Sequence, residues 1–144
     1  MANYKSTRNV VLCGHGSSGK TTLTDAFLEI TKAVEGSPSV DDGTSICDFD
    51  PEEKHHKYSI EAAVTHFKHT GKNFNVVDTP GYPDFIGQVI GPLSAVETAL
   101  IVINATSGIE VNTRRVFDEA GAAGIGRMIA INKLDSDNID FPGL

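Results

Sequence analysis

The chain has 144 residues, 40% of them hydrophobic, and a formal net charge of −7. This length and composition predict a single domain with one core. The negative charge argues against binding of nucleic acid by the domain as a whole, so we expect no DNA partner. No apolar run approaches the roughly 20 residues that cross a bilayer, and the N-terminus has no signal-peptide pattern. We therefore expect a cytoplasmic protein with no membrane partner.

Patterns typical of strands and of helices alternate along the chain. The predicted strands are 9–13, a hairpin of 58–68 and 73–77 around a turn at 69–72, then 99–103 and 128–131, the last two fully buried. The predicted helices are Thr21 to about Val34, with Leu23, Ala26, Phe27 and Ile30 on its inner stripe, a short helix near 93–97, and 111–122. Residues 36–57 are polar and predict a long loop. The alternation predicts an α/β fold with a mostly parallel sheet covered by helices on both faces.

Glycine-rich residues follow the first predicted strand. The segment from Gly14 to Thr21, GHGSSGKT, has the spacing of a phosphate-binding loop between a strand and a helix. In such a loop backbone N–H groups surround the β-phosphate, Lys20 reaches the β- and γ-phosphate oxygens, and the Thr21 hydroxyl binds Mg²⁺. The alternative is a glycine turn with a solvated lysine. The spacing and its context favour a nucleoside triphosphate site.

Two further motifs follow predicted strands at the same edge of the sheet. A carboxylate such as that of Asp135, in Asn132-Lys133-Leu134-Asp135, can accept hydrogen bonds from the N1–H and the amino group of guanine, a pair that adenine does not offer. Asn132 is expected to join this segment to the phosphate loop, and the Lys133 stem to cover the base. In Asp78-Thr79-Pro80-Gly81, Asp78 can reach Mg²⁺ through water and the Gly81 N–H can contact a γ-phosphate. Each motif alone is weak, and the first could be a capped turn, but together they predict a guanine nucleotide.

In these motifs the sequence resembles the G domain of translational GTPases, and specifically elongation factor G. The likeness runs through GHGSSGKTTL, DFDPEEKHHKYSI, DTPGYPDF, ALIVINATSGIEVNTRRVFDEA and INKLD. It implies a P-loop NTPase three-layer fold in which residues 1–144 are the N-terminal portion of the GTP-binding domain, truncated after the guanine-specificity motif. It also implies a switch that binds GTP/GDP and Mg²⁺ and hydrolyses GTP on the ribosome, in translocation or recycling, with later domains making most ribosome contacts.

The resemblance implies three sets of site residues. The nucleotide-binding set is Gly14, His15, Gly16, Ser17, Ser18, Gly19, Lys20, Thr21, Thr22, Asp78, Thr79, Pro80, Gly81, Tyr82, Asn132, Lys133, Leu134 and Asp135. The metal set is Thr21, Ser59 and Asp78, and the catalytic set is Lys20, Gly81 and Tyr82. The resemblance further implies that DDGTSICDFDPEEKHHKYSI is switch I and PGYPDFIGQVIGP is switch II.

The sequence departs from the family pattern at four points. Switch I usually reads Arg-Gly-Ile-Thr-Ile or Arg-Gly-Ile-Ser-Ile, whereas here residues 56–60 are HKYSI, which keeps a hydroxyl at Ser59. Ser17 stands where translational GTPases often carry Asp. Tyr82 replaces a His that orients the attacking water, so we expect slow intrinsic hydrolysis. The strand and Ser-Ala loop that follow in the family are absent from these 144 residues, so we expect weaker nucleotide binding than in a longer relative.

Two other hypotheses fit parts of the sequence. A GTP-binding regulatory module with little hydrolysis is suggested by Tyr82, and an ATP-dependent kinase by the phosphate loop, although residues 132–135 disfavour it. The remaining charged residues have simpler interpretations. His55 and His56 could contact RNA or phosphate but are expected on a solvated loop. The carboxylates Asp41, Asp42, Glu52 and Glu53 match no calcium loop and are expected in a mobile loop.

Overall fold

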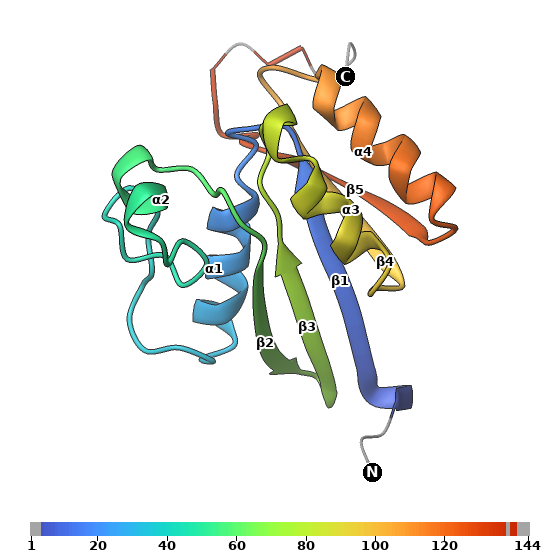
Figure 1. The fold of residues 1–144 in the computed structure, drawn as a ribbon. Coiled ribbons are helices and arrows are strands. Elements are labelled where there is room, and N and C mark those ends of the chain that lie inside the picture. The colour runs from blue at the N-terminus through green and yellow to red at the C-terminus, as the bar shows by residue number, and fades with distance from the viewer. Residues whose placement is uncertain (1–3, 138, 141–144) are drawn as a thin grey trace.

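The structure is a computed structural model that describes residues 4–137 and 139–140. Figure 1 shows its arrangement. The strands are β1 (Thr7–Gly14), β2 (Ala63–His69), β3 (Lys72–Asp78), β4 (Thr98–Asn104) and β5 (Gly126–Asn132). The helices are η1 (Tyr4–Ser6), α1 (Lys20–Ile30), α2 (Pro51–His56), η2 (Pro83–Phe85), α3 (Gly87–Leu93) and α4 (Val111–Ala122). None of these helices is long and apolar enough to cross a lipid bilayer.

The strands form one sheet in the order β2-β3-β1-β4-β5. β1 is parallel to β3 and β4, and β5 is parallel to β4, while β2 and β3 form the expected antiparallel hairpin. The predicted mostly parallel sheet is thus confirmed. Leu12 pairs with Asp78, and Asn104 pairs with Asn132, so the segments that follow β1, β3 and β5 all leave the same edge of the sheet.

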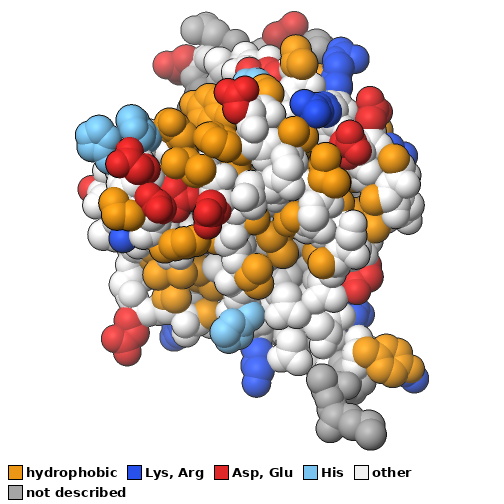
Figure 2. All heavy atoms as spheres, in the orientation of Figure 1, with side chains coloured by type: hydrophobic (Ala, Val, Ile, Leu, Met, Phe, Trp, Pro, Cys, Tyr) orange, Lys and Arg blue, Asp and Glu red, His pale blue; other side chains and the backbone are white. Residues whose placement is uncertain are grey.

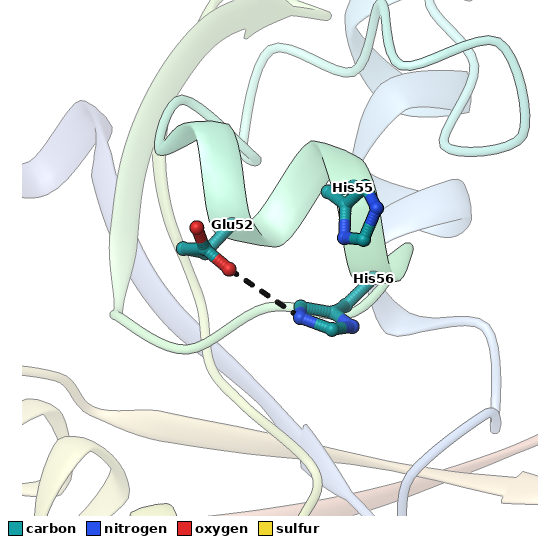
Figure 3. A group of neighbouring side chains, drawn as sticks. All are labelled: Glu52, His55 and His56. Atoms are coloured by element: carbon teal, nitrogen blue, oxygen red, sulfur yellow. Dashed lines mark ion pairs between the residues drawn. The ribbon is translucent and has the colours of Figure 1, made fainter.

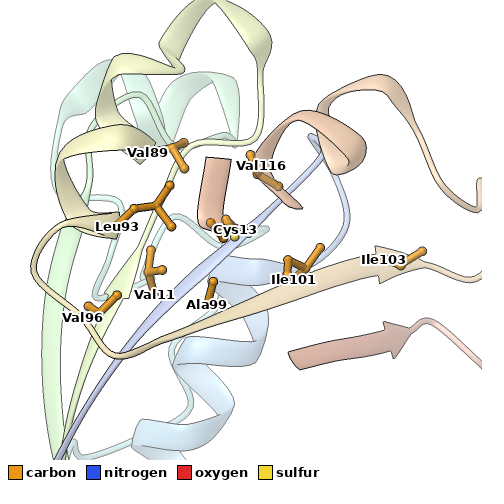
Figure 4. Packing of buried hydrophobic residues seen from close by; sticks show 10 residues of the cluster. Val11, Cys13, Val89, Leu93, Val96, Ala99, Ile101, Ile103 and Val116 are labelled. Carbon is orange, nitrogen blue, oxygen red and sulfur yellow. The ribbon is translucent and has the colours of Figure 1, made fainter. Parts of the chain in front are cut away.

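Alternating side chains of the central strand β1 build a core on each face of the sheet. Val11 and Cys13 are fully buried under α3 and α4, in the cluster drawn in Figure 4. Leu12 lies on the opposite face with Leu28 of α1 and Phe67 of β2. Successive residues of a strand point to opposite faces, which explains the two clusters. Helices therefore cover both faces, as predicted.

Helix α1 is shorter than predicted. It ends at Ile30 rather than near Val34, because Lys32, two residues further on, has a left-handed φ of 56° that breaks the helical backbone. Of the predicted inner stripe, Ile30 is 76% exposed. The buried residues of α1 include Thr24 and Leu28, one turn apart. Leu23 and Phe27 of the predicted stripe do pack against the core on this face of the sheet, so the stripe holds for these two residues and fails at Ile30.

Two other helical predictions were wrong. Residues 36–57 are not all loop, because Pro51–His56 form α2. The short helix expected near 93–97 instead covers Gly87–Leu93. That stretch, GQVIGPL, has two glycines and a proline, which disfavour a helix in isolation. Val89 and Leu93 are almost completely buried in the core, so tertiary packing stabilises the helix against its propensity.

Strand β5 is less buried than its apolar sequence predicts. Met128 is 59% exposed and Ile129 56% exposed. Among the described strands β5 pairs only with β4, so it lies at an edge of the sheet. A continuous apolar run is typical of a strand buried on both faces, and here that pattern fails because the strand is peripheral.

Candidate nucleotide-binding site

The turn between β1 and α1 is shaped by glycines. Gly19 caps α1 in the left-handed region, with φ 91°, and its carbonyl accepts the N–H of Leu23. A Cβ at Gly19 would collide with the Asn132 side chain. The turn delivers Lys20 and Thr21 as the first residues of the helix, whose N-terminus favours an anion. The local geometry is therefore that of a phosphate-binding loop.

Lys20 is 5% exposed and reaches under this loop. Its Nζ donates a 2.8 Å hydrogen bond to His15 O. Burial lowers the pKa of Lys20, whereas the nearby Asp78 carboxylate raises it. Gly81 packs directly against this group, since a Cβ there would collide with Lys20 Nζ, Gly16 N and His15 O. Only glycine fits where the Asp78–Gly81 turn approaches the phosphate loop.

Two hydroxyls and two carboxylates meet beside Lys20. Thr21 Oγ1 donates to Asp78 Oδ2 over 2.7 Å, and Ser59 Oγ donates to Asp48 Oδ1 over 2.8 Å. The two hydroxyl oxygens lie 3.0 Å apart. Because each hydroxyl gives its one proton to a carboxylate, both oxygens keep lone pairs for a cation. The structure thus brings the predicted metal set of Thr21, Ser59 and Asp78 together.

The carboxylates of this group carry an electrostatic cost. Burial raises the pKa of Asp78 to about 7, against the hydrogen bond from Thr21 and the charge of Lys20. Burial also raises the pKa of Asp48, although its hydrogen bond with Ser59 opposes the shift. Asp78 Oδ1 is buried without a hydrogen-bond partner. A hard divalent cation such as Mg²⁺ prefers oxygen ligands, so these residues fit it.

Asp48 and Glu53 belong to this region but were not recognised from the sequence. Glu53 was expected in a mobile loop, yet it is fully buried. Its Oε1 accepts the N–H groups of Ile60 and Glu61 at 2.8 and 3.0 Å, and its Oε2 accepts that of Asp50 at 3.0 Å. Glu53 therefore fixes the backbone next to Ser59. Asp50-Pro51-Glu52-Glu53 has the capping-box spacing, and that signal predicts the start of α2 and the bond from Glu53 back to the Asp50 N–H.

Thr79 and Gly81 hold the turn that follows β3. Thr79 Oγ1 donates to Leu12 O over 2.7 Å, which ties the turn to β1. Asn112, at the start of α4, donates from Nδ2 to Gly81 O over 2.8 Å and is itself buried. Pro80 is also buried. Asn112 was not recognised, and no motif in the sequence marks it.

Tyr82 lies over the phosphate loop. The residue is extended, with φ −82° and ψ 140°, as expected before Pro83. Its ring is so close to Gly16 that a Cβ there would lie 3.2 Å from Tyr82 Cζ, and it meets Tyr58 edge-on with ring centroids 4.9 Å apart. Its side chain therefore borders the phosphate loop.

The segment Asn132–Asp135 reaches the phosphate loop through one side chain. Asn132 Nδ2 donates to Ser18 O over 3.0 Å, so the structure contains the contact expected from the sequence. Lys133 has a left-handed φ of 61°, and the Asp135 side chain is exposed. Leu134 is 54% exposed. These residues lie at the same edge of the sheet but outside the cavity described next.

A cavity of about 90 Å³ unites most of the other predicted residues. Its lining residues are Gly16, Ser17, Gly19, Lys20, Thr21, Thr22, Val40, Asp48, Lys57, Tyr58, Ser59, Thr79, Gly81 and Tyr82. Gly14 and Ser18 are buried and are not among the lining residues. His15 faces Glu110, with its Nε2 3.5 Å from Glu110 Oε1.

Comparisons with known proteins agree with this geometry. The family described as "Elongation factor Tu GTP binding domain" matches residues 5–142. An elongation factor G-like protein of Mycobacterium tuberculosis is 41% identical over 93% of the chain, and elongation factor G 2 of Streptomyces coelicolor is 34% identical over the same share. The tetracycline resistance protein TetO of Campylobacter jejuni is 35% identical. The chain spans 19–21% of the length of these relatives.

A solved structure supports the same assignment. A crystal structure of a protein from Thermus thermophilus has a TM-score of 0.87 and 40% sequence identity, and the match covers 89% of this chain and 19% of that one. The bacterial selenocysteine-specific elongation factor EF-Sec, at a TM-score of 0.71 and 22% identity, shares the fold. The family match and these relatives show that the chain belongs to the elongation-factor GTP-binding domains, as the G domain of a translational GTPase.

Proposed function

We propose that this domain is the GTP-binding switch of an elongation factor G-like protein and that it hydrolyses GTP to GDP and phosphate during translation. The observation that carries the proposal is the convergence of Thr21, Ser59, Asp78 and Asp48 beside Lys20, under a phosphate-binding loop. Such a cluster of hydroxyls and carboxylates next to a buried lysine suits a metal-bound triphosphate.

The residues of the chain divide the binding task. Backbone N–H groups of the loop and the start of α1 bind the α- and β-phosphates, and Lys20 neutralises the β- and γ-phosphate oxygens. Bound Mg²⁺, held by Thr21, Ser59 and Asp78, would neutralise charge that develops on the phosphates during transfer. The Gly81 N–H contacts the γ-phosphate, and Asp135 selects guanine. Ser59, through Mg²⁺, and the Gly81 N–H connect two different segments to the γ-phosphate. Loss of the γ-phosphate therefore releases both segments.

The residue expected to orient the attacking water is where this chain differs from the family that it resembles. Tyr82 borders the phosphate loop, and its phenol offers an O–H donor and only a weak acceptor. We propose that Tyr82 orients the water and that intrinsic turnover is slow. The same feature favours the second candidate, a GTP/GDP-binding regulatory module with little hydrolysis.

Similarity to elongation factor G-like proteins and to TetO suggests a cytoplasmic site of action on the ribosome. The net charge of −7 gives the domain no general attraction to RNA. We propose that most ribosome contacts come from other parts of the full-length protein, and that ribosome binding completes the arrangement around Tyr82.

The test compares nucleotides and then turnover. Binding of GTP, GDP and ATP, each with Mg²⁺, is measured by calorimetry, and phosphate release is followed under single-turnover conditions with and without ribosomes. GTP and GDP should bind and ATP should not. Release that is accelerated by ribosomes supports the hydrolytic switch, whereas tight GTP binding without release in either setting supports the regulatory module. Equal affinity for ATP would overturn both.

A further inference from the structure

A cluster of metal-binding side chains lies on α2, outside the nucleotide cavity. Glu52, His55 and His56 each present one donor atom, and all three atoms lie within 4.8 Å of one another. Figure 3 shows Glu52 and His56 facing each other along one side of the helix, with His55 above them, and the Glu52 Oε2–His56 Nε2 distance is 3.4 Å. All three side chains are exposed. In Figure 2 the pale-blue histidines stand next to acidic side chains on the open surface near α2.

We propose that these three residues form a binding site for a divalent transition-metal ion such as Zn²⁺. Zn²⁺ ligands lie about 2 Å from the ion, so donor atoms around one ion are roughly 3.3 Å apart. The Glu52–His56 pair already has this separation. The donor atom of His55 lies within 4.8 Å of both, so only a small shift of its exposed side chain is needed for it to bind the same ion. Water supplies the remaining ligand of a four-coordinate ion. Two imidazoles with a carboxylate suit Zn²⁺, Ni²⁺, Co²⁺ or Cu²⁺ and not Mg²⁺, so this site is distinct from the one at Thr21.

The backbone that carries the cluster is held in place. Asp50 caps α2 by accepting the Glu52 N–H over 2.8 Å, and Glu53 anchors the other side of the helix through its buried carboxylate. The ligands on the outer side of α2 thus stand on a fixed turn even though the helix has only six residues. A fixed turn lowers the entropy that metal binding must overcome.

The rings around the cluster restrict it further. His55 and His56 meet edge-on at a centroid distance of 4.7 Å, and His56 stacks on Tyr58 at 5.5 Å. Lys54, next to His55, and Lys57, next to His56, are the charges close along the chain that oppose a cation. The two buried thiols compete poorly for the metal ion. Burial raises the pKa of Cys13 to about 12 and also raises that of Cys47, and a protonated thiol is a weak ligand.

Calorimetric titration of the metal-free chain with Zn²⁺, in millimolar Mg²⁺, tests the site. The wild type should bind one ion. The double variant His55→Ala/His56→Ala should bind at least about tenfold more weakly, since even the outer partners of a metal ligand change affinity by about 10–100-fold. The matched control is His66→Ala/His69→Ala, which removes two exposed histidines from β2 and should bind as the wild type does. Circular dichroism checks the fold of both variants.

Two further measurements place the ion. Glu52→Gln keeps the shape of the side chain and should also weaken Zn²⁺ binding. Cu²⁺ bound beside His56 should quench the fluorescence of Tyr58, and Tyr58→Phe should remove most of that quenching. Binding that survives the loss of His55 and His56, binding lost equally in the His66/His69 control, or Zn²⁺ that millimolar Mg²⁺ displaces would each overturn the proposal.

Discussion

Asn132 Nδ2 donates a 3.0 Å hydrogen bond to Ser18 O and so joins the segment after β5 to the phosphate loop. Replacing Asn132 by Ala leaves the carbonyl group of the buried residue Ser18 without this donor, and an unsatisfied buried group costs about 1–3 kcal/mol of free energy. We expect Asn132→Ala to weaken GTP binding by roughly tenfold or more. Calorimetric titration with GTP measures the affinity. Asn73→Ala, on β3 at the far end of the sheet, is the control and should bind as the wild type does. Equal affinity in the two variants would show that the hydrogen bond does not support the nucleotide.

Asp135 is expected to choose the base. In Asp135→Asn an amide group donates where the carboxylate accepted, so the variant should bind GTP weakly and prefer xanthosine triphosphate. A site built on such hydrogen bonds rejects a mismatched base because buried groups are left unpaired. Competition between the two nucleotides measures the exchange of preference. The exposed neighbour Asp137→Asn serves as the control and should keep the preference for GTP. Unchanged GTP affinity in Asp135→Asn would contradict the role of Asp135 in guanine recognition.

Lys20 is buried and donates to His15 O, within the wall of the cavity. Lys20→Ala removes a desolvated positive charge, so triphosphate binding should fall below detection while the fold is kept. Far-UV circular dichroism and calorimetry separate the two effects. Lys32→Ala, at an exposed lysine beyond the end of α1, is the control and should bind normally. An unfolded Lys20→Ala protein would mean that the lysine is structural.

Much of the fold could be predicted because local patterns and packing agree there. The hairpin β2–β3, the strand β4 and the helix α4 all lie where the sequence places them, within a few residues. The glycine spacing of the phosphate loop also predicted its strand–turn–helix setting. In these regions the hydrophobic period, the turn residues and the tertiary contacts all favour one structure.

The remainder depends on tertiary contacts that no local pattern contains. Helix α3 forms from a sequence rich in glycine and proline because Val89 and Leu93 are buried in the core. Asn112 supports Gly81 from a helix that begins 30 residues further along the chain. Glu53 is the exception, since its capping-box spacing with Asp50 was visible in the sequence. Its buried carboxylate places Ser59, which a reading of the segment as a mobile loop misses.

The Asp78 carboxylate should make stability depend on pH. Its folded pKa is about 7, and an unfolded Asp has a pKa of about 3.9. Between these values the folded state holds a proton that the unfolded state lacks, so this residue's contribution to stability falls as pH rises from about 4 to about 7. Asp78→Asn has no such titration. In the presence of a metal chelator, the free energy of unfolding of Asp78→Asn should therefore rise relative to that of the wild type as the pH rises from 5 to 8. Urea unfolding measures this difference.

Mg²⁺ provides the control for this prediction. At pH 8 the ion should stabilise the wild type, whose carboxylate is then charged, and should have little effect on Asp78→Asn. Asp48 and Asp25 also have raised pKa values and remain in both proteins, so only the difference between them reports on residue 78. The same pH profile for both proteins would contradict the assigned titration.

Tyr82 and Tyr58 make the most direct test of the hydrolytic step. The Tyr82 ring is close to Gly16 and to the Tyr58 ring, and a phenol can donate a hydrogen bond to water but accepts one only weakly. An imidazole can accept from water and would be favoured as a cation beside the γ-phosphate. Since positioned groups of this kind contribute about 10²–10⁴-fold, Tyr82→His should raise single-turnover phosphate release. The phosphate loop and Mg²⁺ stay in place, so wild-type release should be slow but measurable.

Tyr58→Phe supplies the matched control, because it keeps the ring that meets Tyr82 and changes only a hydroxyl. Its rate should equal that of the wild type, whereas Tyr58→Ala removes the ring contact and should alter release by freeing Tyr82. Ribosomes should narrow the gap between wild type and Tyr82→His if they position Tyr82, as partners do for other GTPases. Equal rates for wild type and Tyr82→His, both with and without ribosomes, would show that residue 82 does not act on the water.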